Sequence, residues 1–240
     1  MQASRPGAFP RCRARALVAR RFRNQNCRVS GADRGAQVAP LTRRHVRAAG
    51  RLLSTAFDDD PVIGHFLPKS AKRDAVLPGF FRSTIEAALP LGHVYGVTSD
   101  GRLLAAAVWF PPVEHGGAPQ IPWRARTALL PTRVAYGKRL SSLLAGFERL
   151  GSHHPSEPHW YLAFVAVTPT LQSGGLGARV LAPVLEQADD AGLSCYLETP
   201  FPRTHRFYER LGFERIDELY AFGDAPPVVT FLRRPRPPAG

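Results

Sequence analysis

Three glycines within four residues mark the part of the chain that is best suited to bind an anion. Gly174, Gly175 and Gly177 lie in LQSGGLGARVLAPVL, between a continuously apolar run and a segment with helical periodicity. A helix N-terminus carries unpaired backbone N–H groups and a partial positive charge. Glycine there lets the backbone approach a ligand and adopt positive φ angles. The segment predicts a cradle for a phosphate or pyrophosphate, although a plain tight turn would also explain three glycines taken alone.

Two common phosphate-binding motifs do not fit this turn. It lacks the Lys-Ser/Thr pair of a P-loop, which disfavours a nucleoside triphosphate with magnesium. Its glycine spacing also differs from the G-x-G-x-x-G of dinucleotide-binding folds. The cysteines Cys12, Cys27 and Cys195 form no C-x-x-C pair and no metal-ligand set with histidine, so we expect neither a metal nor a disulfide framework.

The context of the glycine turn resembles the GNAT superfamily of N-acetyltransferases. Gln172–Gly177 fits Q/R-x-x-G-x-G/A, the acyl-CoA pyrophosphate motif of that superfamily. RFYERLGF (Arg206–Phe213) is similar to its second hallmark, a tyrosine followed by a helix-ending Gly-Phe. EPHWYLAFVAVTPTLQ, AGLSCYLETPFPRTHRFYERLGF and AFDDDP resemble the puromycin N-acetyltransferase type. The resemblance is convincing over about residues 157–213 and weaker from about Val38 to the last strand.

The resemblance implies an acetyl-CoA-dependent enzyme that transfers an acetyl group to a primary amine, with a small molecule as the expected acceptor. Backbone groups of Phe164, Val165 and Val167 would bind the pantetheine arm like an added strand. One of their N–H groups would polarise the thioester carbonyl. The pyrophosphate would be held by the segment that comprises Gln172, Ser173, Gly174, Gly175, Leu176, Gly177 and Ala178.

The resemblance also implies catalytic positions. Tyr208 is expected to protonate the leaving thiolate, and the alternative is a core tyrosine. No general base is evident, but Glu198, at the end of a central strand, could bind the amine or act through water. Thr204 stands where the superfamily usually has a cofactor-binding Asn. The superfamily often has Gly and then Lys or Arg where this chain has Ser173 and Gly174, so a hydroxyl replaces one cation.

Three acidic residues and two histidines lie outside the two superfamily motifs. Asp58, Asp59 and Asp60 follow the first expected helix, where they could attract a cationic acceptor or form a solvated cluster at the helix end. His153 and His154 fall in the expected loop GSHHPSEP, which predicts surface residues.

Two alternatives compete with a small-molecule N-acetyltransferase. One is a protein or peptide N-acetyltransferase, and the other is a non-catalytic acyl-CoA-binding GNAT domain. The presence of Tyr208 favours catalysis, and the long insert GGAPQIPWRARTALLPTRVAYGKRL favours a walled small-molecule pocket. Either that pocket or the core would contain the aromatic residues Trp109, Phe110, Trp123 and Tyr136.

The elements that must position these residues alternate between strands and helices, which predicts an α/β fold. We expect a GNAT fold: a central mixed twisted sheet, splayed between its two central strands, with helices on both faces. The expected strands are residues 36–41, 93–98, 102–110, 159–167, 193–199, 213–222 and 227–234. The expected helices are about residues 42–57, 71–89 and 123–150, the segment from the glycine turn to about 191, and residues 202–212.

Charge and composition set the expected domain limits. The chain has 240 residues, 44% of them hydrophobic, and a formal net charge of +13. Residues 1–36 contain nine arginines and one acid, and we expect a disordered extension, with a transit peptide or nucleic-acid arm as alternatives. The GNAT domain is expected over residues 37–233, and a disordered Pro-rich end over 234–240. We expect a cytoplasmic monomer or homodimer that binds neither membranes nor nucleic acid, because no long apolar segment and no second basic patch is present.

Overall fold

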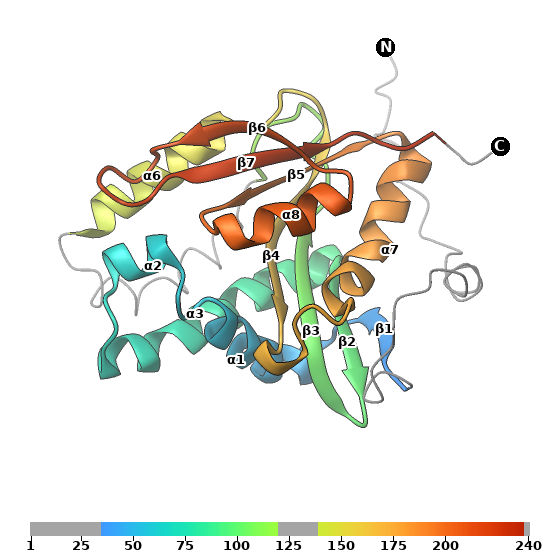
Figure 1. Cartoon of the computed structure of the whole chain (residues 1–240), viewed down its shortest axis with the longest axis horizontal. Helices are drawn as coiled ribbons and strands as arrows, with labels where there is room; N and C mark the ends of the chain where they lie inside the picture. Colours follow the sequence, from blue (N-terminus) through green and yellow to red (C-terminus); the bar gives the residue numbers. More distant parts are fainter. Residues whose placement is uncertain (1–34, 120–138, 238–240) are drawn as a thin grey trace, which may run out of the picture.

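Seven strands form one mixed sheet in the computed structural model, which describes residues 35–119 and 139–237. The strand order is β1-β2-β3-β4-β5-β7-β6. In Figure 1, β1–β4 form the lower part of the sheet and β5, β7 and β6 cross the upper part in a different direction. The strands are β1 Gln37–Pro40, β2 Val94–Ser99, β3 Arg102–Phe110, β4 His159–Val167, β5 Ser194–Thr199, β6 Glu214–Leu219 and β7 Val228–Arg233.

Helices cover both faces of this sheet, and the sequence explains where several of them begin. Asp60 and Ser70 occupy N-cap positions, where their side chains accept hydrogen bonds from the N–H groups of Ile63 and Arg73. The α-helices of the described residues are α1 Val46–Ala56, α2 Pro61–Phe66, α3 Ala71–Ala88, α6 Leu140–Ser152, α7 Leu176–Ala191 and α8 Pro202–Arg210. None of the helices described is long and apolar enough to cross a membrane.

The sheet divides between β4 and β5, which run parallel. The two strands pair only over His159–Leu162 and Ser194–Leu197. Beyond those pairs β4 continues along β3 to Val167, whereas β5 continues along β7 to Thr199. The strands therefore separate at their carboxyl ends, and the predicted splay, here called the fork, is confirmed.

A β-bulge in β4 lies at the start of the fork. Phe164 pairs with Val108 and Leu162 pairs with Trp109, so Ala163 has no partner on β3. As a result, the consecutive residues Ala163 and Phe164 both face the α1–α3 side, whereas Leu162 faces α7. Such a bulge bends the strand and changes the direction of its backbone groups.

Separate apolar clusters fill the two faces. One joins α7 and α8 to the sheet and includes Trp109, Tyr208 and Cys195, which is fully buried. Burial raises the pKa of the Cys195 thiol to about 12, so this residue is an inert part of the core. The other cluster joins α1 and α3 to the sheet and includes Phe110. Trp109 and Phe110 are thus core residues, while Trp123 and Tyr136 lie outside the described residues.

The structure departs from two local predictions. DDDPV ends α1 as expected, but Asp60 and Pro61 also begin α2, a helix that was not predicted, as N-cap and first helical residue. The expected GSHHPSEP loop begins inside a helix, because α6 continues to Ser152. The earlier part of the helical region predicted there lies outside the described residues.

Candidate active site

The glycine turn forms a set of backbone donors at the start of α7. Ser173 and Gly175 have φ angles of +66° and +85°, and Gly175 is the N-cap of the helix. Left-handed residues in such a turn bring successive N–H groups to one side, which creates an anion-binding concavity. Gln172, Ser173 and Gly174 are exposed, and the first turn of α7 contains no acidic residue. The turn therefore fits a pyrophosphate.

Gly177, the third glycine, serves close packing. A Cβ at this position would lie 3.0 Å from the ring of Phe207 on α8 and 3.6 Å from the Val167 side chain on β4. The absence of a side chain lets α7 approach both elements. Gly175 is therefore needed for its backbone conformation, and Gly177 for the close approach of α7 to its neighbours.

The edge of β4 along the fork offers backbone groups to an extended ligand. The N–H of Thr168 donates to the carbonyl of Leu104 on β3, at 2.9 Å. Because backbone groups alternate between the two sides of a strand, those of Val167 and Val165 point away from β3, toward the fork. The backbone N–H and carbonyl of Phe164 point toward β3. The geometry favours Val165 and Val167 as the backbone partners of a pantetheine arm.

Tyr208 lies on α8 beside the same fork, with 6% of its surface exposed. Its ring packs against Phe213 and Phe231, with centroids 5.9 Å away in both cases. Burial raises its pKa well above the ordinary value for tyrosine, so the phenol keeps its proton at neutral pH. Its hydroxyl makes no hydrogen bond to the residues that the structure describes, and is free to donate one.

Glu198 is the first residue of β5 beyond the last β4–β5 pair. Only 8% of its side chain is exposed. The Tyr161 hydroxyl donates a hydrogen bond of 3.0 Å to Oε2, and His154 Nε2 lies 3.4 Å from Oε1. Burial and the Glu198 charge raise the pKa values of Tyr161 and Tyr196 well above the ordinary range, so both phenols stay neutral. The buried carboxylate thus lies among neutral phenols and one imidazole.

His154 was expected to be a surface residue, and this prediction was wrong. Its side chain is 3% exposed and contacts Glu198, whereas that of His153 is exposed as predicted. The helix α6 ends at Ser152, and the chain then returns to β4 with His154 turned inward. No periodicity marks a buried residue in such a connection, so the sequence contains no local signal for it.

Comparison with known proteins agrees with this geometry. Residues 90–213, slightly more than half of the chain, match the sequence model of the acetyltransferase (GNAT) family. The chain belongs to the GNAT acetyltransferase family. This region contains the fork, the glycine turn and Tyr208. The members of the family are acyl-CoA-dependent enzymes, so the prediction of an acyltransferase is confirmed.

Solved structures share the GNAT fold over most of the chain. An acetyltransferase from Corynebacterium glutamicum, described with histone acetyltransferase HPA2, has a TM-score of 0.64 and 23% identity, over 86% of this chain and 99% of its own. A polyamine N-acetyltransferase from Drosophila melanogaster has a TM-score of 0.56 and 18% identity, over 83% and 99%. An agmatine N-acetyltransferase in its apo form has a TM-score of 0.55 and 18% identity, over 83% and 99%. At these identities the likeness shows the fold.

Thr204 holds α8 of this GNAT fold against the end of β5. Its hydroxyl donates to the carbonyl of Phe201 at 2.8 Å and lies 3.1 Å from the hydroxyl of Thr199. The Thr199 hydroxyl accepts in turn from the N–H of Phe201, at 3.2 Å. The Thr204 proton is therefore already used, and a contact with a cofactor would have to use the oxygen as acceptor. Gln172, also a predicted ligand, places its amide 3.5 Å from the Val167 carbonyl.

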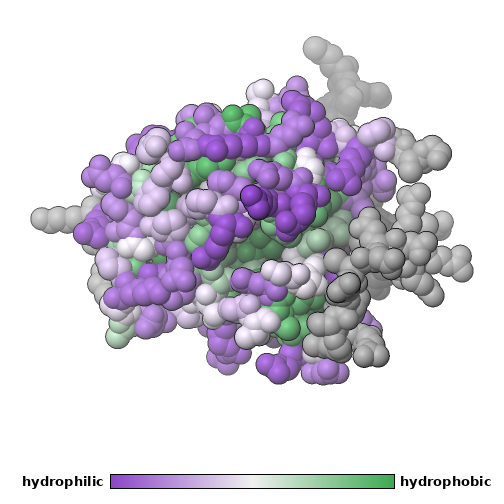
Figure 2. Space-filling view, viewed as in Figure 1, coloured by the Kyte–Doolittle hydropathy of each residue, from purple (hydrophilic) through white to green (hydrophobic). Residues whose placement is uncertain are grey.

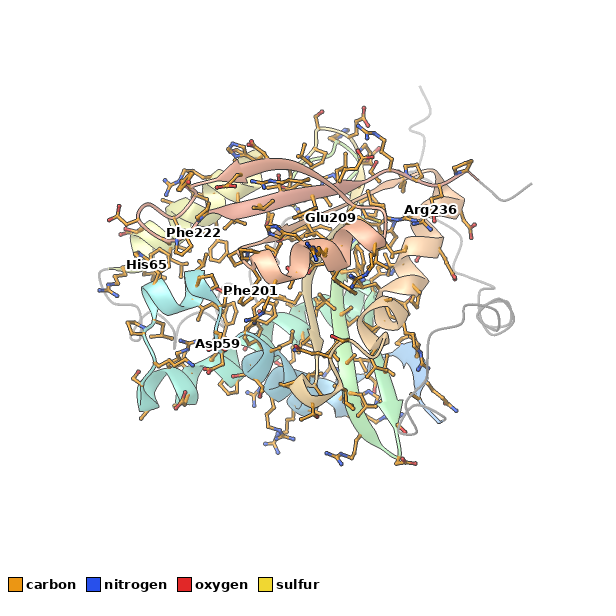
Figure 3. All side chains as sticks on the ribbon, in the orientation of Figure 1. Asp59, His65, Phe201, Glu209, Phe222 and Arg236 are labelled. Atoms are coloured by element: carbon orange, nitrogen blue, oxygen red, sulfur yellow. The ribbon has the colours of Figure 1, made fainter. Side chains whose placement is uncertain are left out.

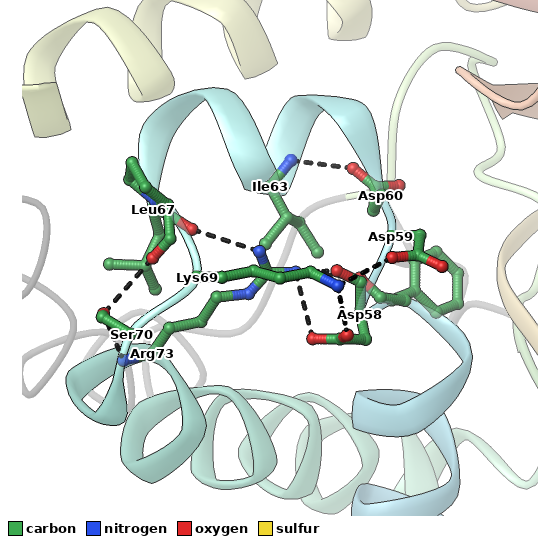
Figure 4. Close-up of polar contacts among 10 residues, drawn as sticks. Asp58, Asp59, Asp60, Ile63, Leu67, Lys69, Ser70 and Arg73 are labelled. Carbon is green, nitrogen blue, oxygen red and sulfur yellow. Dashed lines mark hydrogen bonds and ion pairs between the residues drawn. The ribbon is translucent and has the colours of Figure 1, made fainter.

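The acidic cluster after α1 is already paired (Figure 4). Lys69 contacts Asp58 at 2.8 Å and Asp59 at 2.9 Å, and the buried Arg73 lies 3.6 Å from Asp58. Asp60 is 5% exposed and caps α2, and burial raises its pKa to about 6. Asp60 is therefore not part of a solvated cluster. Lys69 and Arg73 compensate the charge of the other two residues, which leaves little net attraction for a cationic acceptor.

A surface cavity of about 380 Å³ lies between α2, α6 and the segment that joins β6 to β7. Its lining includes His65, Phe222 and two arginines, Arg139 and Arg149. Figure 3 shows His65 and Phe222 near each other at this end of the molecule, and Phe201 nearer the centre. In Figure 2, apolar side chains also show in the middle of the same face, between polar upper and lower parts. The cavity carries more positive than negative charge.

Proposed function

We propose that this GNAT protein transfers the acetyl group of acetyl-CoA to a primary amine of a small molecule. The observation that carries the proposal is the turn at Ser173–Gly175, which presents backbone donors at the helix start beside the fork. A phosphate-bearing cofactor fits there because the donors are oriented before it binds. When bound, acetyl-CoA supplies an activated acyl group as a thioester.

Different parts of the site would bind different parts of acetyl-CoA. Backbone amides of the Gln172–Ala178 segment would hold the pyrophosphate. The fork-facing backbone groups of Val165 and Val167 would bind the pantetheine amides, with Phe164 giving shape through its ring, which packs 5.3 Å from that of Phe81. One fork-facing N–H would stabilise the negative charge that develops on the thioester oxygen. Thr204 keeps α8 in place and stays a candidate ligand only as an acceptor.

The transfer needs two proton movements in opposite directions. The amine nitrogen attacks the thioester carbonyl, a C–N bond forms, and the C–S bond breaks. Tyr208 gives its proton to the leaving thiolate, and the neutral state that burial imposes suits it to this task. Glu198 is the candidate to receive the proton that the amine nitrogen loses.

The acceptor class is inferred from the structural neighbours and from the charge of the acidic cluster. The structural neighbours include enzymes for polyamine and agmatine, which are small amines, and this supports a small-molecule acceptor here. The acidic cluster is already paired with Lys69 and Arg73, which favours an acceptor that is not a polycation. Segments that resemble the puromycin N-acetyltransferase type make puromycin a sensible member of any test panel.

The test is release of free CoA by purified full-length protein, with acetyl-CoA and a panel of amines. The panel contains puromycin, arylalkylamines, polyamines, amino acids and lysine-containing peptides. We expect release that depends on a small amine and an acetylated product by mass spectrometry. Acetyl transfer to peptides alone would show that the acceptor is a protein or peptide and not a small molecule. Tight CoA binding without transfer to any amine would reject catalysis and favour an acyl-CoA-binding domain.

A further inference from the structure

The buried contacts of His154 determine where its protons lie. His159 Nδ1 lies 2.8 Å from the carbonyl of Glu157, which can only accept, so Nδ1 carries a proton. Burial lowers the pKa of His159, which keeps that ring neutral, and its Nε2 is therefore an acceptor. His154 Nδ1 lies 3.1 Å from that Nε2 and must donate to it. The remaining nitrogen of His154 then faces Glu198.

His154 and Glu198 need one proton between them where their side chains face each other. His154 Nε2 lies 3.4 Å from Oε1 of Glu198, and this oxygen is buried without a hydrogen bond to any residue of the described structure. A neutral His154 with its proton on Nδ1 presents a lone pair to a carboxylate that also presents lone pairs. Such a buried contact between two acceptors is unfavourable, whereas one proton placed in the gap satisfies both atoms.

We propose that His154, fixed in one tautomer by His159, is the proton partner of Glu198, so that the pair takes the proton lost by the attacking amine. The inference rests on the proposed function and assigns the base that sequence reasoning left open. The amine proton moves to the Glu198 carboxylate, and His154 Nε2 accepts a hydrogen bond from it or takes it up. His154 acts through Glu198 and is a positioning residue.

In the described part of the chain, the aromatic side chains that contact the pair are two phenols and a second imidazole. Tyr161 donates to the other Glu198 oxygen, at 3.0 Å, and its ring packs 4.7 Å from that of His154. The Tyr196 ring lies 4.6 Å from the His154 ring. Burial keeps both phenols protonated. With His159 neutral as well, the Glu198–His154 contact is the place among these described groups where a proton can lie between two acceptor atoms.

The activity test compares His154→Gln with His153→Gln. Glutamine at 154 retains polar character but cannot take up a proton, whereas His153 is exposed and lies outside the pair. We expect His154→Gln to lower kcat about 10- to 100-fold at neutral pH with little change in the KM for acetyl-CoA. The acidic limb of its pH–rate profile should move to lower pH, because a lone carboxylate holds a proton less tightly than the pair. His153→Gln should match the wild type.

A purely structural role of His154 would lower the rate without moving the limb, and an unmoved limb would overturn the inference. Nitrogen-15 NMR of the imidazoles separates the inference from the proposed function. In Glu198→Gln the titration midpoint of His154 should fall, because an opposite charge has been removed. His159→Gln, which can still accept from His154, should keep the wild-type tautomer that His159→Leu loses. An unchanged His154 titration in Glu198→Gln rejects the pair, even if wild-type protein acetylates no amine in the panel.

Discussion

The ring of Phe207 lies 3.0 Å from the point where a Cβ on Gly177 would stand. Two helices that flank the proposed cofactor site, α7 and α8, therefore touch through a residue that has no side chain. Because α8 contains Tyr208 and α7 begins at the glycine turn, this contact sets the distance between the proposed acid and the proposed pyrophosphate site.

The Gly177→Ala variant should lose stability. Its methyl group would press on the edge of an aromatic ring, and overpacking of this kind costs about 1–3 kcal/mol. Gly79→Ala is the matched control, because Gly79 is also helical and a Cβ there meets nothing within 4 Å. Denaturant unfolding should show a loss for the first variant and a small gain for the second. Adding Phe207→Leu to Gly177→Ala should restore part of the loss, and equal stability of both single variants would contradict the steric explanation.

The glycine turn can be tested with isosteric substitutions. Gly175 has a φ of +85°, a conformation that Asn and Asp both tolerate better than other residues. Gly175→Asp should weaken acetyl-CoA binding at least about tenfold more than Gly175→Asn, because only Asp sets a negative charge against the pyrophosphate. Calorimetric titration with acetyl-CoA measures the difference.

Gly192 provides the control for backbone strain in that experiment. It has a φ of +66° at the other end of α7, and a Cβ there meets nothing within 4 Å. Gly192→Asp should lose stability without losing acetyl-CoA affinity. Equal acetyl-CoA affinities for the Asp and Asn variants at position 175 would show that the pyrophosphate does not bind at this turn.

The sequence predicted the fold well because its patterns are local. The apolar run of β4 and the periodic face of α7 need no tertiary information to be recognised, and the family model confirms the fold they indicate. The short helix α2 was missed because Asp60-Pro61 looks the same at the end of one helix and at the start of another. Only the structure shows that Asp60 caps the second one.

The candidate site was predictable to a lesser degree. The glycine turn and Tyr208 belong to contiguous motifs, so their placement beside the fork could be expected. Phe164 was expected to share the backbone role of Val165, but consecutive strand residues direct their backbone groups to opposite sides, so those of Phe164 point toward β3. The contact between His154 and Glu198 joins residues far apart in sequence, and a loop histidine has no periodicity that would indicate burial.

Asp60 should make folding stability fall as pH rises through the acidic range. Burial raises its folded pKa from 3.8 to about 6, so the native state binds more protons than the unfolded state between these values. Ionisation of Asp60 therefore costs stability, up to about 3 kcal/mol by the size of the shift. Asn is an equally good N-cap, so Asp60→Asn should remove this cost, and its advantage over wild type should grow from pH 4 to pH 7.

The control for this pH effect is Asp59→Asn, which should behave in the opposite sense. The hydrogen bond and charge of Lys69 hold the pKa of the exposed Asp59 below its ordinary value. This contact stabilises the fold above the unfolded pKa and is lost as pH falls. Thermal melts at several pH values should thus separate the two variants, and a pH-independent difference for Asp60→Asn would reject the ionisation cost.

Tyr208→Phe should remove the proposed acid while leaving the fold intact. The hydroxyl has no hydrogen-bond partner among the described residues, and the ring contacts with Phe213 and Phe231 remain in the variant. General acid–base groups contribute about 10²- to 10⁴-fold, and we expect kcat to fall by about 10²-fold or somewhat less, because thiolate is a tolerable leaving group. The KM for acetyl-CoA should stay similar. Single-turnover measurements are needed, since slow product release would mask a change in kcat. A folded variant with an unchanged chemical step would show that Tyr208 is a core residue alone, and would remove the main argument for catalysis over simple acyl-CoA binding.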